Sequence, residues 1–183
     1  MLNFSAKLVT KNKDDQIRKF VVSFYLFDQT IGIFEELVPN SGFRHGKFLQ
    51  KTRVKNPATK QFFAPGDFYV GAKITVAARV FELTAAAELA LSLMESNPDD
   101  FPEADLTYVL PRLGEIVKTT GKDLRGMFEA KAKDGKVTIA DAMTVLEQFV
   151  PKLMTKHSAI TITRGFDRDG FFAYEEVLKF LKL

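Results

Sequence analysis

The amino-acid sequence predicts an α+β fold in which a small β structure is followed by a helical domain. Residues 1–96 contain short runs of β-branched and aromatic residues, whereas residues 97–183 show the 3.6-residue periodicity of helices. The charge changes at the same position, from 13 basic and 9 acidic residues before it to 13 basic and 14 acidic residues after it. Segment 95–102 (ESNPDDFP) has two prolines and helix-capping residues. We therefore expect two domains, 1–96 and 97–183.

The composition excludes several classes of protein. With 46% hydrophobic residues and a net charge of +3, the chain is neither disordered nor fibrous. It has no cysteine, so it has no disulfide, no thiolate metal site and no cysteine nucleophile, and its two histidines are too few for a histidine-rich metal centre. No segment approaches the roughly 18 consecutive apolar residues of a membrane span. We expect a cytoplasmic protein with no membrane span.

The strongest β signal lies at 18–36 (RKFVVSFYLFDQTIGIFEE), where a break at Asp28-Gln29 predicts a hairpin. In the first strand, Phe20, Val22, Phe24 and Leu26 share one face, and Val21, Tyr25 and Phe27 share the other. Because both faces are apolar, we expect one to line a core and the other to meet a helix or a partner.

Further short strands are predicted at 2–10, 47–55, 67–70, 73–77 and 79–84, which makes seven in all. A terminal helix is predicted at 85–94 (AAAELALSLM), with Leu89, Leu93 and Met94 on one face. Seven short strands indicate a barrel or a sandwich. A barrel with one C-terminal helix is the architecture of pleckstrin-homology-like domains, although the periodicity is also compatible with another small barrel.

Seven segments resemble the DM10 domain in order and spacing: 18–28, 31–35, 40–42, 46–49, 53–54, 67–71 and 80–83. The resemblance covers about the first 95 residues and implies a pleckstrin-homology-like fold. DM10 domains occur in EF-hand-containing axonemal proteins of the protofilament-ribbon family, also called myoclonin-like, where three of them precede a C-terminal EF-hand region. The chain resembles the last DM10 domain with its tail, so we expect it to be part of a longer protein.

The second domain begins with a predicted helical stripe made of Leu106, Val109, Leu110, Leu113, Ile116 and Val117. Pro111 is expected to kink this helix or to begin a new one, and Gly121 is expected to end it. Two similar units follow: helices at 124–128 and 139–153 flank one Asp-Gly loop, and helices at 160–162 and 174–181 flank another.

Gly135 and Gly170 of these loops lie 35 residues apart, which is the spacing of paired EF-hands. Val137 and Phe172 are then expected to meet in a short antiparallel bridge between the loops. We therefore predict an all-α EF-hand-like pair after the barrel.

Calcium binding needs oxygen ligands at loop positions 1, 3, 5, 7, 9 and 12. The first loop has Ala130 and Ala132 at positions 1 and 3, and three lysines surround it. The second keeps carboxylates at positions 3, 5 and 12, namely Asp167, Asp169 and Glu176, but has Gly165 and Ala173 at positions 1 and 9. We expect a packing module with no cofactor, and weak calcium binding at these three carboxylates is the alternative.

The candidate partner-binding site is a basic segment. Residues 37–66 include no acidic residue but contain Arg44, Lys47, Lys51, Arg53, Lys55 and Lys60. Such a segment favours an acidic partner, either a tubulin surface or phosphoinositide headgroups, whereas a net charge of only +3 disfavours nucleic acid. The alternative is a solvated edge strand whose lysines prevent edge pairing. We take the first five cations as the candidate site.

No catalytic constellation is found. His45 has no nucleophile or carboxylate near it in the sequence, and segments 42–47 and 114–122 lack the spacing of a phosphate loop. We therefore expect a non-enzymatic protein. The resemblance implies a structural protein of ciliary or flagellar axonemal doublet microtubules, located on their lumenal side and bound to tubulin and other inner proteins. A calcium-responsive regulatory module is the alternative function.

Overall fold

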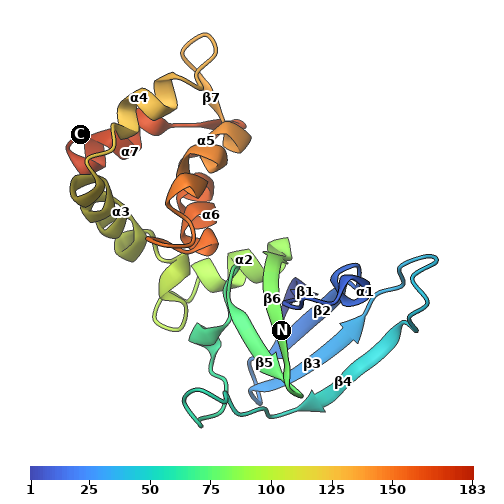
Figure 1. Cartoon of the computed structure of the whole chain (residues 1–183). Coiled ribbons are helices and arrows are strands. Elements are labelled where there is room, and N and C mark those ends of the chain that lie inside the picture. Colours follow the sequence, from blue (N-terminus) through green and yellow to red (C-terminus); the bar gives the residue numbers. More distant parts are fainter. The chain divides into compact units, whose positions relative to one another are not determined.

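The computed structural model describes all 183 residues, which form two compact units, Met1–Phe101 and Pro102–Leu183 (Figure 1). The boundary lies five residues after the one expected from the sequence. Segment 97–101 belongs to the first unit, where Phe101 is buried and the backbone of Asp100 lies against Gly66. None of the helices combines the length and the apolar character needed to cross a membrane.

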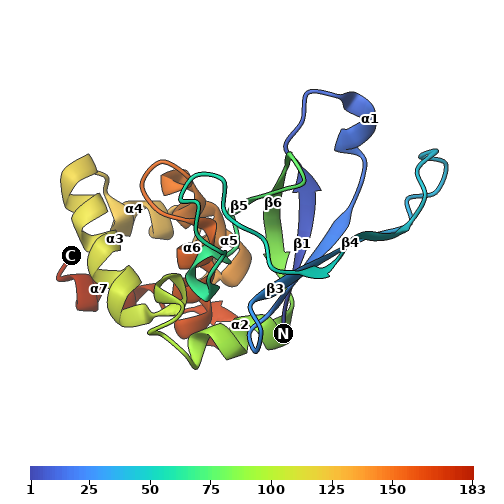
Figure 2. The same cartoon turned by 90° about the horizontal axis from the view of Figure 1, so that it is seen from below.

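The first unit contains a six-stranded antiparallel sheet with the strand order β4-β3-β2-β1-β6-β5. Its elements are β1 (Leu2–Leu8), α1 (Lys13–Gln16), β2 (Phe20–Tyr25), β3 (Thr30–Glu35), β4 (Gly46–Thr52), η1 (Pro65–Asp67), β5 (Lys73–Val76), β6 (Arg79–Ala86) and α2 (Glu88–Glu95). The predicted hairpin is confirmed as β2 and β3, which are joined by a turn where Gln29 has a φ of 52°. Figures 1 and 2 show the curl of the sheet.

Two expectations about this sheet are wrong. β4 and β5 are its free edges, so the sheet is curled but is not closed into a barrel. The seventh strand, predicted at 67–70, is absent because two turns occupy this segment. Asp67 ends a 3-10 turn that begins at Pro65, and the N–H of Ala72 then donates a hydrogen bond of 3.0 Å to the carbonyl oxygen of Tyr69. The carboxylate of Asp67 accepts a hydrogen bond of 2.9 Å from the backbone N–H of Ala64, which gives this N–H a partner outside any strand ladder.

One face of the sheet carries the core of the first unit. The buried residues alternate along the strands, as in Phe20, Val22 and Phe24 of β2, and the rings of Phe24 and Phe68 stack with centroids 4.1 Å apart. The opposite face of β2 is only half-buried. The alternation therefore leaves a partly exposed outer face, which the sequence analysis expected to meet a helix or a partner.

Helix α2 begins later than predicted. β6 continues to Ala86 because its last residues pair with β1, and the helix therefore begins at Glu88 rather than at residue 85. Its buried residues are Ala90, Leu91 and Met94. Leu89, which was expected to share a face with Leu93 and Met94, is 76% exposed, whereas Met94 is buried.

A buried ion pair joins the segment just before β2 to the last residue of β3, at one end of the hairpin. Arg18 and Glu35 are 8% and 6% exposed, and Nε and Nη2 of Arg18 donate hydrogen bonds of 2.7 Å to the two carboxylate oxygens of Glu35. Nη1 donates another of 2.7 Å to Asp15, and the guanidinium lies 4.4 Å from the ring centroid of Phe43. The hydrogen bonds to Glu35 raise the pKa of Arg18 above its ordinary value. This cluster connects the region around α1, the hairpin and the loop that leads to β4.

The second unit is mainly helical. Its elements are η2 (Pro102–Ala104), α3 (Leu106–Thr120), α4 (Leu124–Glu129), β7 (Val137–Thr138), α5 (Ile139–Leu146), η3 (Glu147–Phe149), α6 (Lys156–Gly165), β8 (Asp167–Arg168), β9 (Phe171–Phe172) and α7 (Tyr174–Leu181). α3 is a single helix that runs through Pro111 and ends, as predicted, at Gly121 in the left-handed conformation. The predicted helix 139–153 stops early because Pro151 forces Val150 into an extended conformation with ψ of 144°.

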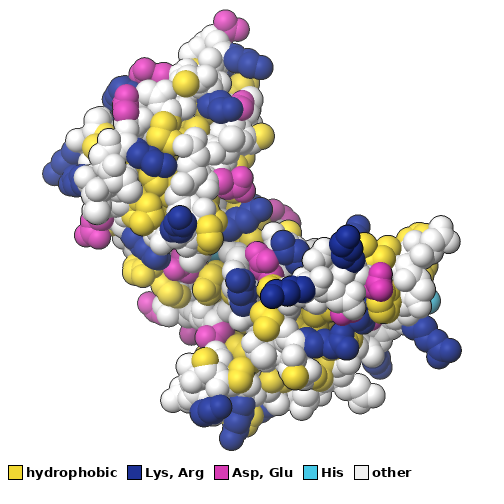
Figure 3. All heavy atoms as spheres, viewed as in Figure 1, with side chains coloured by type: hydrophobic (Ala, Val, Ile, Leu, Met, Phe, Trp, Pro, Cys, Tyr) yellow, Lys and Arg dark blue, Asp and Glu magenta, His cyan; other side chains and the backbone are white.

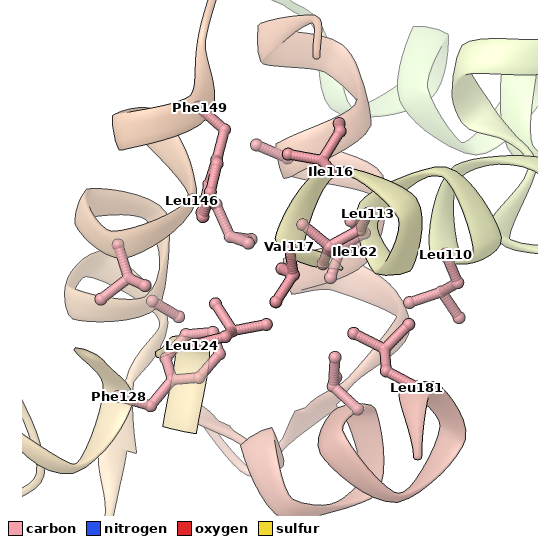
Figure 4. Close-up of a cluster of buried hydrophobic side chains, with 14 of the residues drawn as sticks. Leu110, Leu113, Ile116, Val117, Leu124, Phe128, Leu146, Phe149, Ile162 and Leu181 are labelled. Atoms are coloured by element: carbon pink, nitrogen blue, oxygen red, sulfur yellow. The ribbon is translucent and has the colours of Figure 1, made fainter. Parts of the chain in front are cut away.

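The helices of this unit enclose one apolar core, shown in part in Figure 4. Val117 of α3 points towards Leu124 of α4, and Leu113 lies beside Ile162 of α6. Leu181 of α7 lies near Leu110 and against Gly114, near the middle of α3. The predicted bridge is confirmed, since Val137 of β7 pairs with Phe172 of β9 in antiparallel register. Both residues are buried, so the bridge is part of the core.

The buried ion pair leads to a stability prediction. We expect Arg18→Met to lower the free energy of unfolding of the first unit by about 3–5 kcal/mol, because it leaves the carboxylate of Glu35 buried without its partner. The double variant Arg18→Met/Glu35→Leu removes both charges and should recover most of this loss. Urea denaturation followed by circular dichroism measures both values.

The control is Lys7→Met, which removes an exposed ion pair of 3.4 Å with Glu82 and should cost less than about 1 kcal/mol. If Arg18→Met costs no more than this control, the buried pair does not have the stabilising role described above.

Candidate functional site

The basic segment predicted as a partner site lies on and around the edge strand β4. Lys47 and Lys51 belong to β4, Arg44 precedes it, and Arg53 and Lys55 follow it; all five are exposed. In Figure 3, Lys and Arg side chains lie over the first unit with apolar side chains among them. Since β4 separates Arg44 from Arg53, the structure divides the predicted site into two ends rather than gathering it at one point.

The end that follows β4 is organised around Phe62. The guanidinium carbon of Arg53 lies 4.2 Å from the ring centroid of Phe62, and Nζ of Lys55 lies 5.4 Å from it. Arg53 also donates a hydrogen bond of 3.1 Å to Oε1 of Gln29 in the hairpin turn. Each such cation–π contact stabilises an exposed site by about 0.5–1 kcal/mol. These two cations are therefore held in place by contacts within the first unit.

Lys51 also has partners within the first unit. Its ammonium group lies 2.7 Å from Oδ2 of Asp28 and 4.2 Å from the ring centroid of Tyr25. The hydrogen bond from Lys51, and after it that from Thr30, lowers the pKa of Asp28 below its ordinary value of 3.8. By contrast, Lys47 is exposed and pairs with no carboxylate, so its charge is available to a partner.

Between Lys47 and Lys51 the outer face of the sheet has a groove of about 430 Å3. The groove is lined by Ser23, Tyr25, Gly32, Ile33, Phe34, Lys47, Leu49, Gln50 and Lys51. Ser23 and Gly32 are direct neighbours across β2 and β3, so two small residues meet at one position of the sheet. A Cβ atom on Gly32 would lie 3.6 Å from Cε2 of Tyr25, which places that ring beside the gap.

The lysines of this groove were predicted from the sequence, but its other residues were not. The signal was present: Thr30, Gly32 and Phe34 alternate with the buried Ile31 and Ile33, which puts Gly32 and Phe34 on the outer face. The cross-strand register, which places Ser23 opposite Gly32, could not be predicted from the sequence. A groove formed by residues of two strands can be predicted only when that register is known.

The predicted calcium loops form tight hairpins instead. In the first, Lys133 and Lys136 exchange two backbone hydrogen bonds of 2.9 Å around Asp134-Gly135, whose φ values are 50° and 73°. In the second, Arg168 pairs with Phe171 around a turn whose two central residues also have positive φ. Two consecutive positive φ values at Asp-Gly are typical of a type I′ hairpin turn. In the first loop, the carbonyl at position 7 therefore accepts a backbone hydrogen bond.

The three candidate calcium ligands do not converge. Oδ1 of Asp167 accepts a hydrogen bond of 2.8 Å from the N–H of Gly170, and Oε2 of Glu176 accepts one of 2.8 Å from Nη2 of Arg168. Asp169 is exposed at the tip of the hairpin. No group of three His, Asp or Glu side chains in the structure could hold a metal ion.

The chain is similar to a known domain family and to known proteins. Residues 1–90 match the family model of the DM10 domain. The chain is 37% identical to bovine (Bos taurus) EF-hand domain-containing family member C2 and 30% identical to the zebrafish (Danio rerio) protein of that name, with 95% and 91% of the chain aligned. Human EF-hand domain-containing protein 1 is 37% identical over 57% of the chain. The chain belongs to this DM10 family. The resemblance seen in the sequence is thereby confirmed.

The chain spans 27% of the bovine protein, 23% of the zebrafish protein and 17% of the human protein. The matched residues 1–90 include all six strands of the sheet. The groove therefore lies entirely within the DM10 domain.

The Lys51–Asp28 contact leads to a prediction about pH. Because the folded-state pKa of Asp28 lies below 3.8, the contact stabilises the DM10 domain above that pH, and the contribution is lost as the pH falls through the lowered pKa. We expect Lys51→Met to move the pKa of Asp28 upward towards 3.8, while the Thr30 hydrogen bond keeps it from reaching that value. NMR titration of the carboxyl carbon measures this shift.

Lys47→Met is the matched control, since it removes a cation of the same strand that does not contact Asp28. An Asp28 pKa that is the same in Lys51→Met and in the control would contradict the assignment.

Proposed function

We propose that this DM10 protein is a non-enzymatic structural component of the cytoskeleton in cilia or flagella. In this role it binds tubulin and other inner proteins on the lumenal side of axonemal doublet microtubules and stabilises the doublet. The proposal combines the family with the surface of the DM10 domain, and its mechanism is surface complementarity.

The observation that carries the proposal is the exposed basic surface along β4. No acidic residue occurs between residues 37 and 66, while Arg44, Lys47 and Lys51 are exposed before and along the strand. Tubulin is an acidic protein, so complementary charge favours its encounter with this surface and suppresses like-charged partners. Exposed aromatic side chains beside the cations, such as Phe34 and Phe62, are the residue type that contributes most to protein interfaces.

For the second unit we propose an EF-hand-like pair that acts as a packing module. Three observations support this: the 35-residue spacing of Gly135 and Gly170, the bridge between Val137 and Phe172, and the words "EF-hand domain-containing" in the names of the relatives. The bridge couples the two helix–loop–helix units through buried side chains rather than through an ion.

A triple charge reversal tests tubulin binding. We expect Arg44→Glu/Lys47→Glu/Lys51→Glu to reduce co-sedimentation of the chain with stabilised microtubules by at least tenfold, because the variant places negative charge against an acidic surface. The wild-type interaction should also weaken as the salt concentration rises.

The matched control reverses Lys11, Lys13 and Lys73, three exposed cations away from β4, and so changes the net charge equally. If both triple variants bind as the wild type does, the tubulin contact lies on another face. If both lose binding equally, the attraction is general and does not depend on this surface.

The alternative function is a calcium-responsive module, which requires calcium to bind at the second loop. Glu176 is already paired with Arg168, and the second loop is closed as a hairpin. We therefore expect calorimetric titration of the chain with calcium at millimolar concentration to show no saturable heat. A saturable heat that is lost in Asp169→Asn/Glu176→Gln would instead support the calcium-responsive function.

A further inference from the structure

We infer that the groove on the outer face of the DM10 sheet binds an extended acidic segment of a partner protein, with an apolar side chain seated over Gly32. The inference rests on the proposed function, because the partner is the acidic one that the basic surface attracts. It adds to that function the binding site on the DM10 sheet and the residue pattern of the segment that binds there.

The shape of the groove suits one side chain of an extended segment. Gly32 adds no side chain to its floor, and Tyr25 and Phe34 line it; Phe34 is 45% exposed. The hydroxyl of Ser23 donates a hydrogen bond of 2.8 Å to Oδ1 of Asn3, so this polar atom already has a partner within the sheet. A gap bordered by aromatic rings, with its polar atom satisfied, favours an apolar side chain.

The charges of the groove define what flanks that side chain. Lys47 and Lys51 both line the groove from β4, and they lie closer together than four regular strand residues would place them, because β4 carries two extra residues relative to β3 over this stretch. The side chains at positions i, i+2 and i+4 of an extended segment point the same way. Carboxylates at i and i+4 can therefore reach the two ammonium groups, which are carried on flexible four-carbon stems, while the side chain at i+2 enters the groove. The groove therefore fits an Asp/Glu-x-apolar-x-Asp/Glu pattern. The ammonium group of Lys51 has three hydrogens, so it can bind a second carboxylate besides that of Asp28.

The edge of β4 does not offer the alternative of strand addition. Its register with β3 is interrupted twice, between Ile31 and Ile33 and again between Ile33 and Phe34. Such irregularities disturb the regular spacing of backbone groups that an added strand would need. Recognition by side chains across the face is therefore favoured over main-chain pairing along the edge.

Gly32→Leu gives a direct test because it fills the groove without straining the backbone. Gly32 does not have a positive φ, and an added Cβ would make only ordinary contacts, at 3.6 Å with Cε2 of Tyr25 and at 4.0 Å with the carbonyl oxygen of Leu49. The matched control is Ser5→Leu, an exposed position on β1 that does not line the groove.

The probe is the peptide acetyl-Glu-Ala-Phe-Ala-Glu-amide, titrated into the 15N-labelled chain and followed by NMR. We expect saturable shifts at the amides of Ser23, Gly32 and Phe34, affinity at least tenfold weaker in Gly32→Leu, and unchanged affinity in Ser5→Leu. The same peptide with Lys in place of Glu should cause no shifts. Absence of shifts with the acidic peptide, or equal affinity for all variants, would overturn the inference.

Co-sedimentation of the same variants with stabilised microtubules separates this inference from the proposed function. Loss of binding in Gly32→Leu but not in Ser5→Leu supports both. Equal binding of all three proteins overturns the groove and leaves the tubulin proposal standing. If the wild type does not bind microtubules, the tubulin proposal fails and the peptide titration alone decides the groove. Binding to anionic vesicles that Gly32→Leu abolishes, without any peptide shifts, would assign the groove to a lipid surface instead.

Discussion

Two hydrogen bonds of 2.7 Å join the guanidinium of Arg18 to the carboxylate of Glu35 at a point where both side chains are almost completely buried. Glu35 is the register partner of Phe20, so the pair lies at one end of the β2–β3 hairpin and opposes slippage of one strand along the other. A slip of one residue would exchange the two faces of the hairpin. The phenylalanine core and the outer groove both depend on this register, because it puts Phe24 inside and Ser23 opposite Gly32 outside.

Much of the first unit follows from patterns within single segments. The β2–β3 hairpin could be predicted because the break at Asp28-Gln29 separates two alternating runs, and the bridge between Val137 and Phe172 could be predicted from a repeat spacing. The open sheet could not be predicted, since closure depends on how far β4 and β5, at opposite edges of the sheet, curl towards each other. The early end of α5 was within reach of the sequence, because Pro151 alone disfavours helix at the preceding residue.

The Asp-Gly pairs of the second unit show how one dipeptide supports two structures. Glycine at loop position 6 permits the sharp turn of a calcium loop, and Asp-Gly equally favours a two-residue hairpin turn. The remaining ligand positions decide between the two outcomes. With Ala130 and Gly165 at position 1 there is no carboxylate to hold a cation there, and the backbone groups of the first loop bond to each other instead. The tilted rings of Phe128 and Phe172, with centroids 5.3 Å apart, then connect the loops to the helical core.

The surface cations of the DM10 domain divide into two groups with different consequences for recognition. Arg53 and Lys51 are held by Phe62, Tyr25 and Asp28, so their positions are fixed before any partner arrives. Lys47 has no such contact, and its long side chain must be ordered on binding at a cost in rotamer entropy. Charge by itself would attract an acidic protein to any of these residues with little preference for place. The groove at Gly32, beside Tyr25, is flanked by Lys51, which is held in place, and by Lys47, which is free. Charge attracts the acidic partner to this surface, and the shape of the groove determines where on it the partner binds.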